Sequence, residues 1–334
     1  MSKKYLIVGH GLAGAVLAHT LRQKGQDVRV IDARLPNAAS KVSAGLINPF
    51  IGPKFNLPYD FDQCMEANFM FLKKFDSPEK NFIRAIKLIR VFISKKQQDR
   101  WSSLSEKYKN DMLLNSDCRI IGIKTKFGAG LTTAWQFETQ KFLQVSREIL
   151  CSENRLIIKP FNKKDWPGHD VIFCEGYRVR ENEWFKELPF SPAQGDILTI
   201  KSVLNAHVSN GTWHSPDSRG ANTKLGSTWK HNDFESGPSK LARTQILKNL
   251  TFLPDDLNIK IINQVSGVRS GTLDRNPIMG RHPKLSNYYL FNGFGSRGST
   301  TIALSAMEFA NFLIDQKPIP ERKSILRFLS DYKL

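Results

Sequence analysis

Short, unbroken apolar runs that lead into glycine-rich turns are the most regular feature of this chain. Residues 5–8 form such a run and pass directly into Gly9-His10-Gly11-Leu12-Ala13-Gly14. An apolar run of this length predicts a strand that is buried on both faces, as in a parallel sheet. Apolar positions at helical spacing follow up to Gly25, and residues 28–31 then end at Asp32. We therefore expect a strand, a helix and a second strand in this order.

The same hydrophobic patterns recur further along the chain. Residues 170–174 and 288–291 are apolar runs that predict two more buried strands. The patterns over 138–151 and 301–314 predict helices. Between 194 and 265, short apolar runs alternate with glycines, which is typical of an antiparallel sheet. No internal repeat or low-complexity tract interrupts these elements.

The stretch from 71 to 110 is different because basic residues outnumber acidic ones there. Its isoleucines recur at helical spacing, while its basic residues share another face, so the pattern predicts an amphipathic helical region inserted after the first strands. The residues behind this prediction are Ile83, Ile86, Ile89 and Ile93 on one face and Lys80, Arg84 and Lys87 on the other.

Composition indicates a globular protein with a basic surface. Hydrophobic residues make up 40% of the 334 positions, which excludes a disordered chain. Lys and Arg together number 49 and Asp and Glu 31, for a net charge of +18. Such a charge attracts phosphate-bearing partners, although many enzymes carry a basic surface without binding nucleic acid. No apolar stretch has the length of a membrane helix, so we expect a soluble, cytoplasmic protein that does not bind membranes.

The cysteines give no indication of a metal site or a disulfide framework. Cys64, Cys118, Cys151 and Cys174 are isolated from one another and form no CxxC pair. Isolated thiols are typical of proteins in a reducing cytosol. We therefore expect no bound metal.

The first glycine-rich turn has the spacing and the context of a dinucleotide-binding motif. Gly9 permits the tight turn, Gly11 lets a pyrophosphate approach the backbone, and Gly14 lets the helix pack on the strand. The helix N-terminus then faces the phosphates, and Asp32 is placed to accept hydrogen bonds from the ribose. NAD and FAD share this motif, so the turn alone leaves the cofactor open.

Further segments resemble the FAD-dependent D-amino-acid oxidase superfamily, in particular its glycine-oxidase-like branch. They occur in that family's order and span nearly the whole chain. The late block over 267–283 is similar to the family's G-x-R-x-x-x-x-D-x-x-P-x-x-G pattern, and four shorter segments match other family elements: 43–49, 173–176, 225–228 and 293–298.

The resemblance implies a mixed α/β fold, α+β overall, in which a Rossmann-type FAD-binding domain is interleaved with an antiparallel-sheet substrate domain. The FAD-binding domain is expected over 1–50, 136–184 and 266–334, and the substrate domain, with its basic helical insertion, over 51–135 and 185–265.

The resemblance also implies a cofactor site and a reaction. FAD is expected to bind without a covalent link, because the late cysteine used for that link in sarcosine-oxidase relatives is missing here. Arg269 matches the position that binds the substrate carboxylate, and its planar fork suits that group. The residues expected at the cofactor are Gly9, Gly11, Leu12, Ala13, Gly14, Asp32, Ala44, Gly45, Leu46, Gly176, Gly293, Gly295, Ser296, Arg297, Gly298 and Ser299.

Two departures from the family pattern concern the cofactor site and its neighbourhood. Ser270 stands where the family often has proline, and Glu175 replaces a small residue before Gly176. We therefore expect the turn near the flavin to differ locally.

Three functions follow from the resemblance. The first is oxidation of the carbon–nitrogen bond of an amino acid or N-substituted glycine, a small amine substrate, by hydride transfer to flavin N5. The second is removal of a carboxymethyl group from a modified wobble uridine, because residues 295–298 also resemble the closing turn of the FAD domain of the bifunctional bacterial enzyme for that reaction. The net charge of +18 supports this alternative, which would make tRNA a partner. The third is a flavin-binding protein without redox activity. The sequence leaves the particular amine, the electron acceptor and the oligomeric state open.

Overall fold

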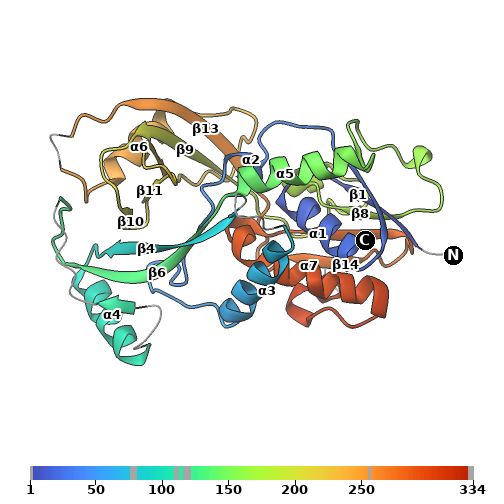
Figure 1. The fold of residues 1–334 in the computed structure, drawn as a ribbon, viewed down its shortest axis with the longest axis horizontal. Coiled ribbons are helices and arrows are strands. Elements are labelled where there is room, and N and C mark those ends of the chain that lie inside the picture. The colour runs from blue at the N-terminus through green and yellow to red at the C-terminus, as the bar shows by residue number, and fades with distance from the viewer. Residues whose placement is uncertain (1–2, 76–80, 109–112, 116–121, 255–256, 330–334) are drawn as a thin grey trace.

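A six-stranded sheet forms one half of the molecule (Figure 1). The computed structural model describes residues 3–75, 81–108, 113–115, 122–254 and 257–329. All neighbouring strands of this sheet run parallel except the first pair, which is antiparallel. In order across the sheet, the strands are β14 (Ile278–Arg281), β15 (Tyr288–Asn292), β8 (Asp170–Phe173), β1 (Lys4–Val8), β2 (Asp27–Ile31) and β7 (Leu156–Ile157).

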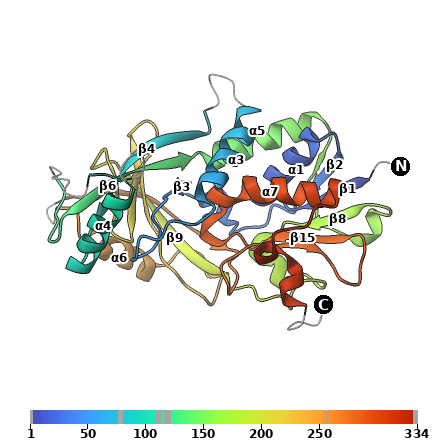
Figure 2. The ribbon, with the colours of Figure 1, turned by 90° about the horizontal axis from the view of Figure 1, so that it is seen from below.

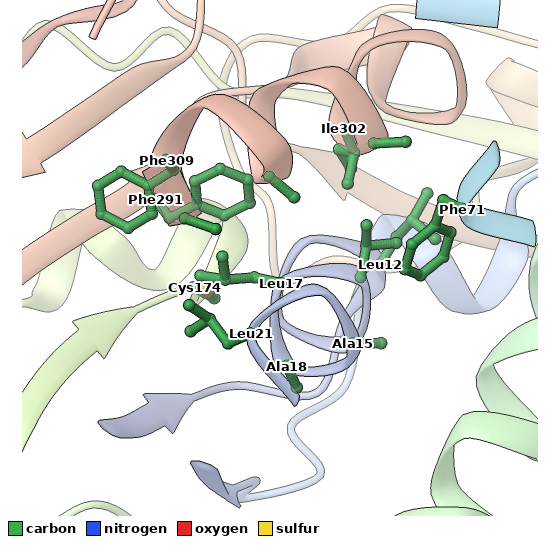
Figure 3. Close-up of a cluster of buried hydrophobic side chains, with 14 of the residues drawn as sticks. Leu12, Ala15, Leu17, Ala18, Leu21, Phe71, Cys174, Phe291, Ile302 and Phe309 are labelled. Carbon is green, nitrogen blue, oxygen red and sulfur yellow. The ribbon is translucent and has the colours of Figure 1, made fainter. Parts of the chain in front are cut away.

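Both faces of this sheet are buried, which explains the unbroken apolar runs. In β1, Tyr5 and Ile7 belong to the core on one face, while Leu6 and Val8 belong to the core on the other. Figure 3 shows the first core, where side chains of α1 meet Phe291, Phe309 and Cys174. The helices that contribute to this core are α1 (Leu12–Gln23), α3 (Phe61–Lys73), α5 (Thr139–Ser152) and α7 (Gly298–Asp315).

Figure 2 shows how these helices lie together, with α7 running alongside α1 and α3. The opposite face is covered by segments without long helices, which include Trp166, Phe185 and Ile325. The remaining short helical turns are α2 (Ala39–Val42) and the 3-10 turns η1 (Lys163–Asp165), η2 (Gly176–Glu181), η3 (Gly295–Arg297), η4 (Glu321–Lys323) and η5 (Ile325–Phe328).

A nine-stranded sheet forms the other half. It is antiparallel apart from the parallel pair of β10 and β4. In order, its strands are β13 (Ile261–Arg269), β9 (Ala193–Lys201), β12 (Asn222–Gly226), β11 (Trp213–Pro216), β10 (His207–Ser209), β4 (Ile83–Val91), β6 (Ala129–Phe137) and β3 (Leu46–Ile47), with β5 (Leu113–Asn115) beside β6.

Two of the longer helices in the described part of the chain accompany this sheet. Helix α4 (Lys95–Lys107) lies at the end of the molecule far from α7 (Figures 1 and 2). Its Trp101 is fully buried against Gly130 of β6, where a Cβ atom would stand 2.0 Å from the indole ring. Helix α6 (Lys240–Asn249) buries Ile246 in the same core as Leu198 and Ile200 of β9.

The prediction of a helical region over 71–110 is wrong for its central part. Residues 83–91 form strand β4, which pairs with β6 from Ile83 to Val91. Isoleucines spaced by three share one face of a helix but fall on alternating faces of a strand. In β4, Ile86 and Ile89 are both buried, in different cores, so both faces of the strand are covered. β-Branched residues favour a strand when a partner is available. The helical parts of the stretch are its first residues, 71–73, which end α3, and its later part, which forms α4, while residues 76–80 and 109–110 lie outside the described part.

The other expected elements are confirmed. The strands at both ends and the helices over 138–151 and 301–314 occur within a few residues of their expected bounds. Helix α6 was not expected, because the glycine punctuation around it favoured strands throughout 194–265. The domain boundaries stay a prediction. Among the described residues, no helix combines the length and the apolar character needed to cross a bilayer.

Candidate active site

A cavity of about 760 Å³ lies between the two sheets. Val8, Ile31 and Phe173, the last residues of three parallel strands, line one side. Ile197 of β9 and Trp213 of β11 reach it from the nine-stranded sheet. Ligands of parallel α/β sheets bind at the carboxyl ends of the strands. The cavity therefore lies where the sequence predicts a nucleotide, with the second sheet available to contact a substrate.

The glycine-rich turn after β1 is held tightly against its surroundings at two of its three glycines. Gly9 has a φ of +103°, and a Cβ atom there would stand 2.7 Å from the carbonyl oxygen of Cys174. At Gly14, a Cβ atom would stand 1.9 Å from the carbonyl oxygen of Gly9. These two positions need glycine for the packing of the chain itself.

Gly11 is different, because nothing in the protein requires a glycine there. Its backbone is extended (φ −81°, ψ −174°), and a Cβ atom would make an ordinary 3.5 Å contact with Ser40 Oγ. Gly11 lines the cavity at the N-terminus of α1. The missing side chain thus leaves space for a ligand rather than for the chain, and the helix end favours an anionic ligand.

Asp32 lines the cavity at the end of β2, as expected. Its Oδ2 accepts a 2.9 Å hydrogen bond from Arg147 Nη2 of α5. Its Oδ1 accepts a weaker bond from the amide of Arg34, at 3.3 Å. The ion pair fixes the carboxylate in place and leaves it further acceptor capacity toward the cavity.

The backbone of residues 43–45, just before β3, packs closely against β6 and forms a hydrogen bond with it. Gly45 has a φ of +67°, and a Cβ atom there would stand 1.8 Å from the carbonyl oxygen of Phe137. The amide of Phe137 donates to the carbonyl of Gly45 at 2.9 Å. Lys224 Nζ donates to the carbonyl of Ser43 at 3.0 Å, and burial lowers the pKa of this lysine. The segment expected beside the flavin ring is therefore rigidly positioned at the cavity wall.

The structure brings most of the expected site residues together around this one cavity. Those that line it are Gly9, Gly11, Leu12, Ala13, Asp32, Ala44, Gly45, Leu46, Gly176, Arg269, Gly295, Ser296, Gly298 and Ser299.

Three expected cofactor residues do not line the cavity. Gly14 lies behind the loop, where it lets α1 approach Gly9. Gly293 has a φ of +85° and packs against Thr272 and Ile278. The Arg297 guanidinium donates to the carbonyl oxygen of Arg275. These residues shape the turns around the site, and a direct role of any of them toward the cofactor stays a prediction.

Glu175 places a carboxyl group in the cavity wall beside the turn that follows β8. Burial raises the pKa of Glu175 to about 7, although a 2.7 Å hydrogen bond from Asn182 Nδ2 lowers it. A carboxyl group with this pKa is partly protonated near neutral pH, so it opposes a neighbouring phosphate less than an ordinary glutamate would.

Arg269 lies at the end of β13 and lines the cavity. Its Nη2 donates to Ser227 Oγ at 2.6 Å and its Nη1 to the carbonyl of Thr228 at 3.4 Å. Gly195 leaves room for the guanidinium, because a Cβ atom there would stand 2.1 Å from Nη2. Burial lowers the pKa of Arg269 to about 10. No carboxylate among the described residues pairs with it.

Sequence reasoning missed two residues at this cavity. Trp229, 56% exposed, lies with its ring 4.3 Å from the Arg269 guanidinium carbon. It directly follows the 225–228 element, so its position was a signal that it is near the site. His10 was not among the expected cofactor residues, yet it lines the cavity within the loop itself. Only its place between two motif glycines could have indicated this.

These features fit FAD. A cavity of this size accommodates a large ligand. The open position at Gly11 and the N-terminus of α1 suit a diphosphate, and Asp32 suits a ribose. The class of protein defined by this fold and site is a nucleotide-dependent enzyme whose second sheet faces the cofactor.

Comparison with known families identifies the cofactor as FAD. A family model described as FAD dependent oxidoreductase (DAO) matches residues 4–148 and 157–312. The chain therefore belongs to this family of FAD-dependent oxidoreductases. Membership of a family of oxidoreductases favours an enzyme over a flavin-binding protein without redox activity.

Two relatives with similar sequences are named as different enzymes. The tRNA 5-methylaminomethyl-2-thiouridine biosynthesis bifunctional protein MnmC of Leptospira interrogans is 21% identical over an alignment that covers 98% of this chain. The chain spans about 60% of the length of that relative. Glycine oxidase of Bacillus subtilis is 26% identical over 48% of this chain and 44% of its own.

Solved structures share the fold along nearly the whole chain. Iminodiacetate oxidase from Chelativorans sp. BNC1 has a TM-score of 0.76 at 15% identity, covering 96% of this chain and 99% of its own. Glycine oxidase from Bacillus cereus has a TM-score of 0.76 at 15% identity, covering 95% and 96%. At these identities the likeness establishes the fold alone.

We expect Gly11→Ala to separate cofactor binding from folding. The added methyl group has room in the protein but enters the space proposed for the diphosphate, so FAD should bind about 1–3 kcal/mol more weakly. The unfolding free energy of the apoprotein should change by less than about 1 kcal/mol. Titration of apoprotein with FAD and urea unfolding measure the two effects.

Gly14→Ala is the matched contrast, because its methyl group overlaps the Gly9 carbonyl and should destabilise the apoprotein itself. Wild-type FAD affinity in Gly11→Ala would contradict the placement of the diphosphate.

Proposed function

We propose that this oxidoreductase oxidises the carbon–nitrogen bond of an amino acid or N-substituted glycine. The observation that carries the proposal is Arg269, a desolvated guanidinium at the cavity wall without a carboxylate partner among the described residues. A partly buried cation without a counter-ion is costly, so a ligand that supplies a carboxylate would be bound strongly there. Amino acids and N-substituted glycines carry this group next to the bond to be oxidised.

The residues around Arg269 orient it for this task. Two of its five N–H donors bond Ser227 Oγ and the Thr228 carbonyl, which leaves three for a substrate carboxylate. Trp229 stacks on the guanidinium and restricts its rotation. A guanidinium held in this way can bind a carboxylate through two parallel hydrogen bonds.

The flavin, when bound, supplies the oxidising chemistry by accepting a hydride at N5 from the carbon attached to nitrogen. The chain's contribution is to hold the substrate by its carboxylate and to keep the reacting carbon in an apolar part of the cavity. Ile197, Trp213 and Phe294 supply apolar surface to its wall. Such a wall limits access of water to the reacting bond.

Arg269→Ala should leave FAD bound and lower kcat/KM for a carboxylate-bearing amine. The loss corresponds to about 2–5 kcal/mol of transition-state stabilisation, since the substrate carboxylate loses its partner. Arg269→Lys should recover only part of this loss, because an ammonium cannot reproduce the planar fork. Flavin absorbance and stopped-flow reduction measure the two effects.

Arg243→Ala is the matched control. Arg243 is exposed on α6, where its Nε donates to Gln264, and it does not line the cavity. Equal reduction rates in wild type and Arg269→Ala would contradict the carboxylate assignment. Loss of FAD from Arg269→Ala would instead assign the residue to the cofactor.

One observation favours a second candidate, in which the N-substituted glycine is part of a modified tRNA base. Trp229 leaves 56% of its surface exposed beside Arg269 at the cavity. An exposed indole next to a guanidinium is a suitable platform for stacking a base. The net charge of +18 is consistent with a polyanionic partner, and the relative MnmC is named for tRNA modification.

Under this second candidate, bulk tRNA should bind with an affinity that falls steeply as salt rises. Trp229→Ala should weaken tRNA binding by about 1–3 kcal/mol, the contribution of one stacked base. Filter binding at several salt concentrations measures both effects, with Trp184→Ala as a control, because Trp184 also lines the cavity but lies against Phe173 of the parallel sheet rather than beside Arg269. Binding that is absent at low salt, or unaffected by Trp229→Ala, would leave a free amine as the substrate.

A further inference from the structure

One serine hydroxyl connects the glycine-rich turn to two helices. Ser146 of α5 is fully buried, and its Oγ lies 2.9 Å from His10 Nε2. The same Oγ lies 2.9 Å from Nε2 of His19, a buried residue of α1. His10 stands between Gly9 and Gly11 and lines the cavity. The hydroxyl therefore couples the position of the turn to the helices that cover the sheet.

The outer end of this chain of hydrogen bonds is a surface ion pair. Arg22 of α1 places Nη1 3.0 Å from His19 Nδ1, while its Nη2 pairs with the carboxylate of Glu153. A guanidinium donates hydrogen bonds and accepts none. His19 Nδ1 must therefore be the acceptor, and the proton of this neutral imidazole must be on Nε2.

The direction of the remaining bonds follows from that assignment. His19 Nε2–H donates to Ser146 Oγ, so the hydroxyl hydrogen is available to bond His10 Nε2. When the hydroxyl donates to His10 Nε2, the proton of a neutral His10 is on Nδ1. In the alternative, both imidazoles donate to Ser146 Oγ, and the buried hydroxyl hydrogen is left without an acceptor among the described residues. Leaving a buried donor unpaired is costly, so the first arrangement is favoured.

The charges around both imidazoles favour this neutral state. Burial and the Arg147 guanidinium lower the pKa of His10 to about 4, against the opposing effect of Asp32. Burial, Arg22 and His10 lower the pKa of His19 to about 3. Both rings are therefore neutral at physiological pH, as the hydrogen-bond directions require.

The position of the proton matters for an anionic cofactor. In a histidine, Nδ1 is the ring nitrogen nearer the backbone, and here that backbone belongs to the turn between Gly9 and Gly11. His10 Nδ1 is buried and forms no hydrogen bond with another described residue. The Nδ1–H tautomer places the positive end of an N–H dipole beside the backbone of the turn, whereas the Nε2–H tautomer would place a lone pair there. A positive end favours a nearby diphosphate.

We propose that Ser146 is a positioning residue for FAD, which holds His10 in its neutral Nδ1–H tautomer through a directional hydrogen-bond chain that begins at Arg22. The proposal rests on the assignment of the turn as the diphosphate site. It goes beyond that assignment because it gives a function to Ser146 and Arg22, which lie outside the glycine motif.

Two-bond ¹H–¹⁵N NMR of the histidine-labelled protein tests the tautomer directly. The His10 signals are assigned by their absence from His10→Gln. We expect Nδ1 to be protonated and Nε2 unprotonated at pH 7, with no titration of the ring down to about pH 5. A His10 that is protonated on Nε2, or that titrates near its ordinary pKa, would overturn the proposal whether or not FAD binds as described.

Ser146→Ala tests the connection to the cofactor. The apoprotein should bind FAD about tenfold more weakly, because the hydrogen bond that orients His10 is lost together with the one to His19, and His10 should show both tautomers. Ser152→Ala is the matched control, because Ser152 lies at the exposed end of the same helix and donates only to the Ile149 carbonyl. Wild-type FAD affinity in Ser146→Ala would refute the positioning role.

Discussion

The close approach of the turn after β1 to strand β8 is the constraint on which the rest of the site depends. Gly9 can lie against the carbonyl of Cys174 only without a side chain, and Gly14 brings α1 within reach of Gly9 in the same way. Because both contacts are backbone contacts, they leave little freedom in the position of the helix end. The N-terminus of α1 is thereby fixed at the carboxyl edge of the sheet, where the cavity opens.

The second sheet completes the site by bringing a cation to that edge. Strand β13 ends at Arg269, and its neighbour β9 supplies Gly195, whose missing side chain provides the space for the guanidinium. The two glycines Gly11 and Gly195 thus serve different groups, the first a ligand and the second a side chain of the protein. This arrangement places the expected cofactor and a carboxylate-binding group in one cavity.

The sequence was most informative where backbone geometry leaves few alternatives. The turn from Gly9 to Gly14 and the buried strand before it could be predicted, because a doubly buried parallel strand must be apolar and a tight turn must carry glycine. Strand β4 could not, since the spacing of Ile83, Ile86 and Ile89 fits a helix locally and only its partner β6 decides the outcome. Trp229 and His10 were missed because their roles depend on neighbours far away in the sequence.

Anaerobic reduction of the bound flavin by matched pairs of amines tests the central claim most directly. Each pair consists of an N-substituted glycine and the same amine without its carboxylate, added to the purified FAD-bound protein while the visible flavin absorbance is followed. We expect at least one N-substituted glycine to bleach the flavin much faster than its matched amine, because only the former can engage Arg269. Equal rates within every pair, or bleaching by the amines alone, would contradict a site built around a carboxylate.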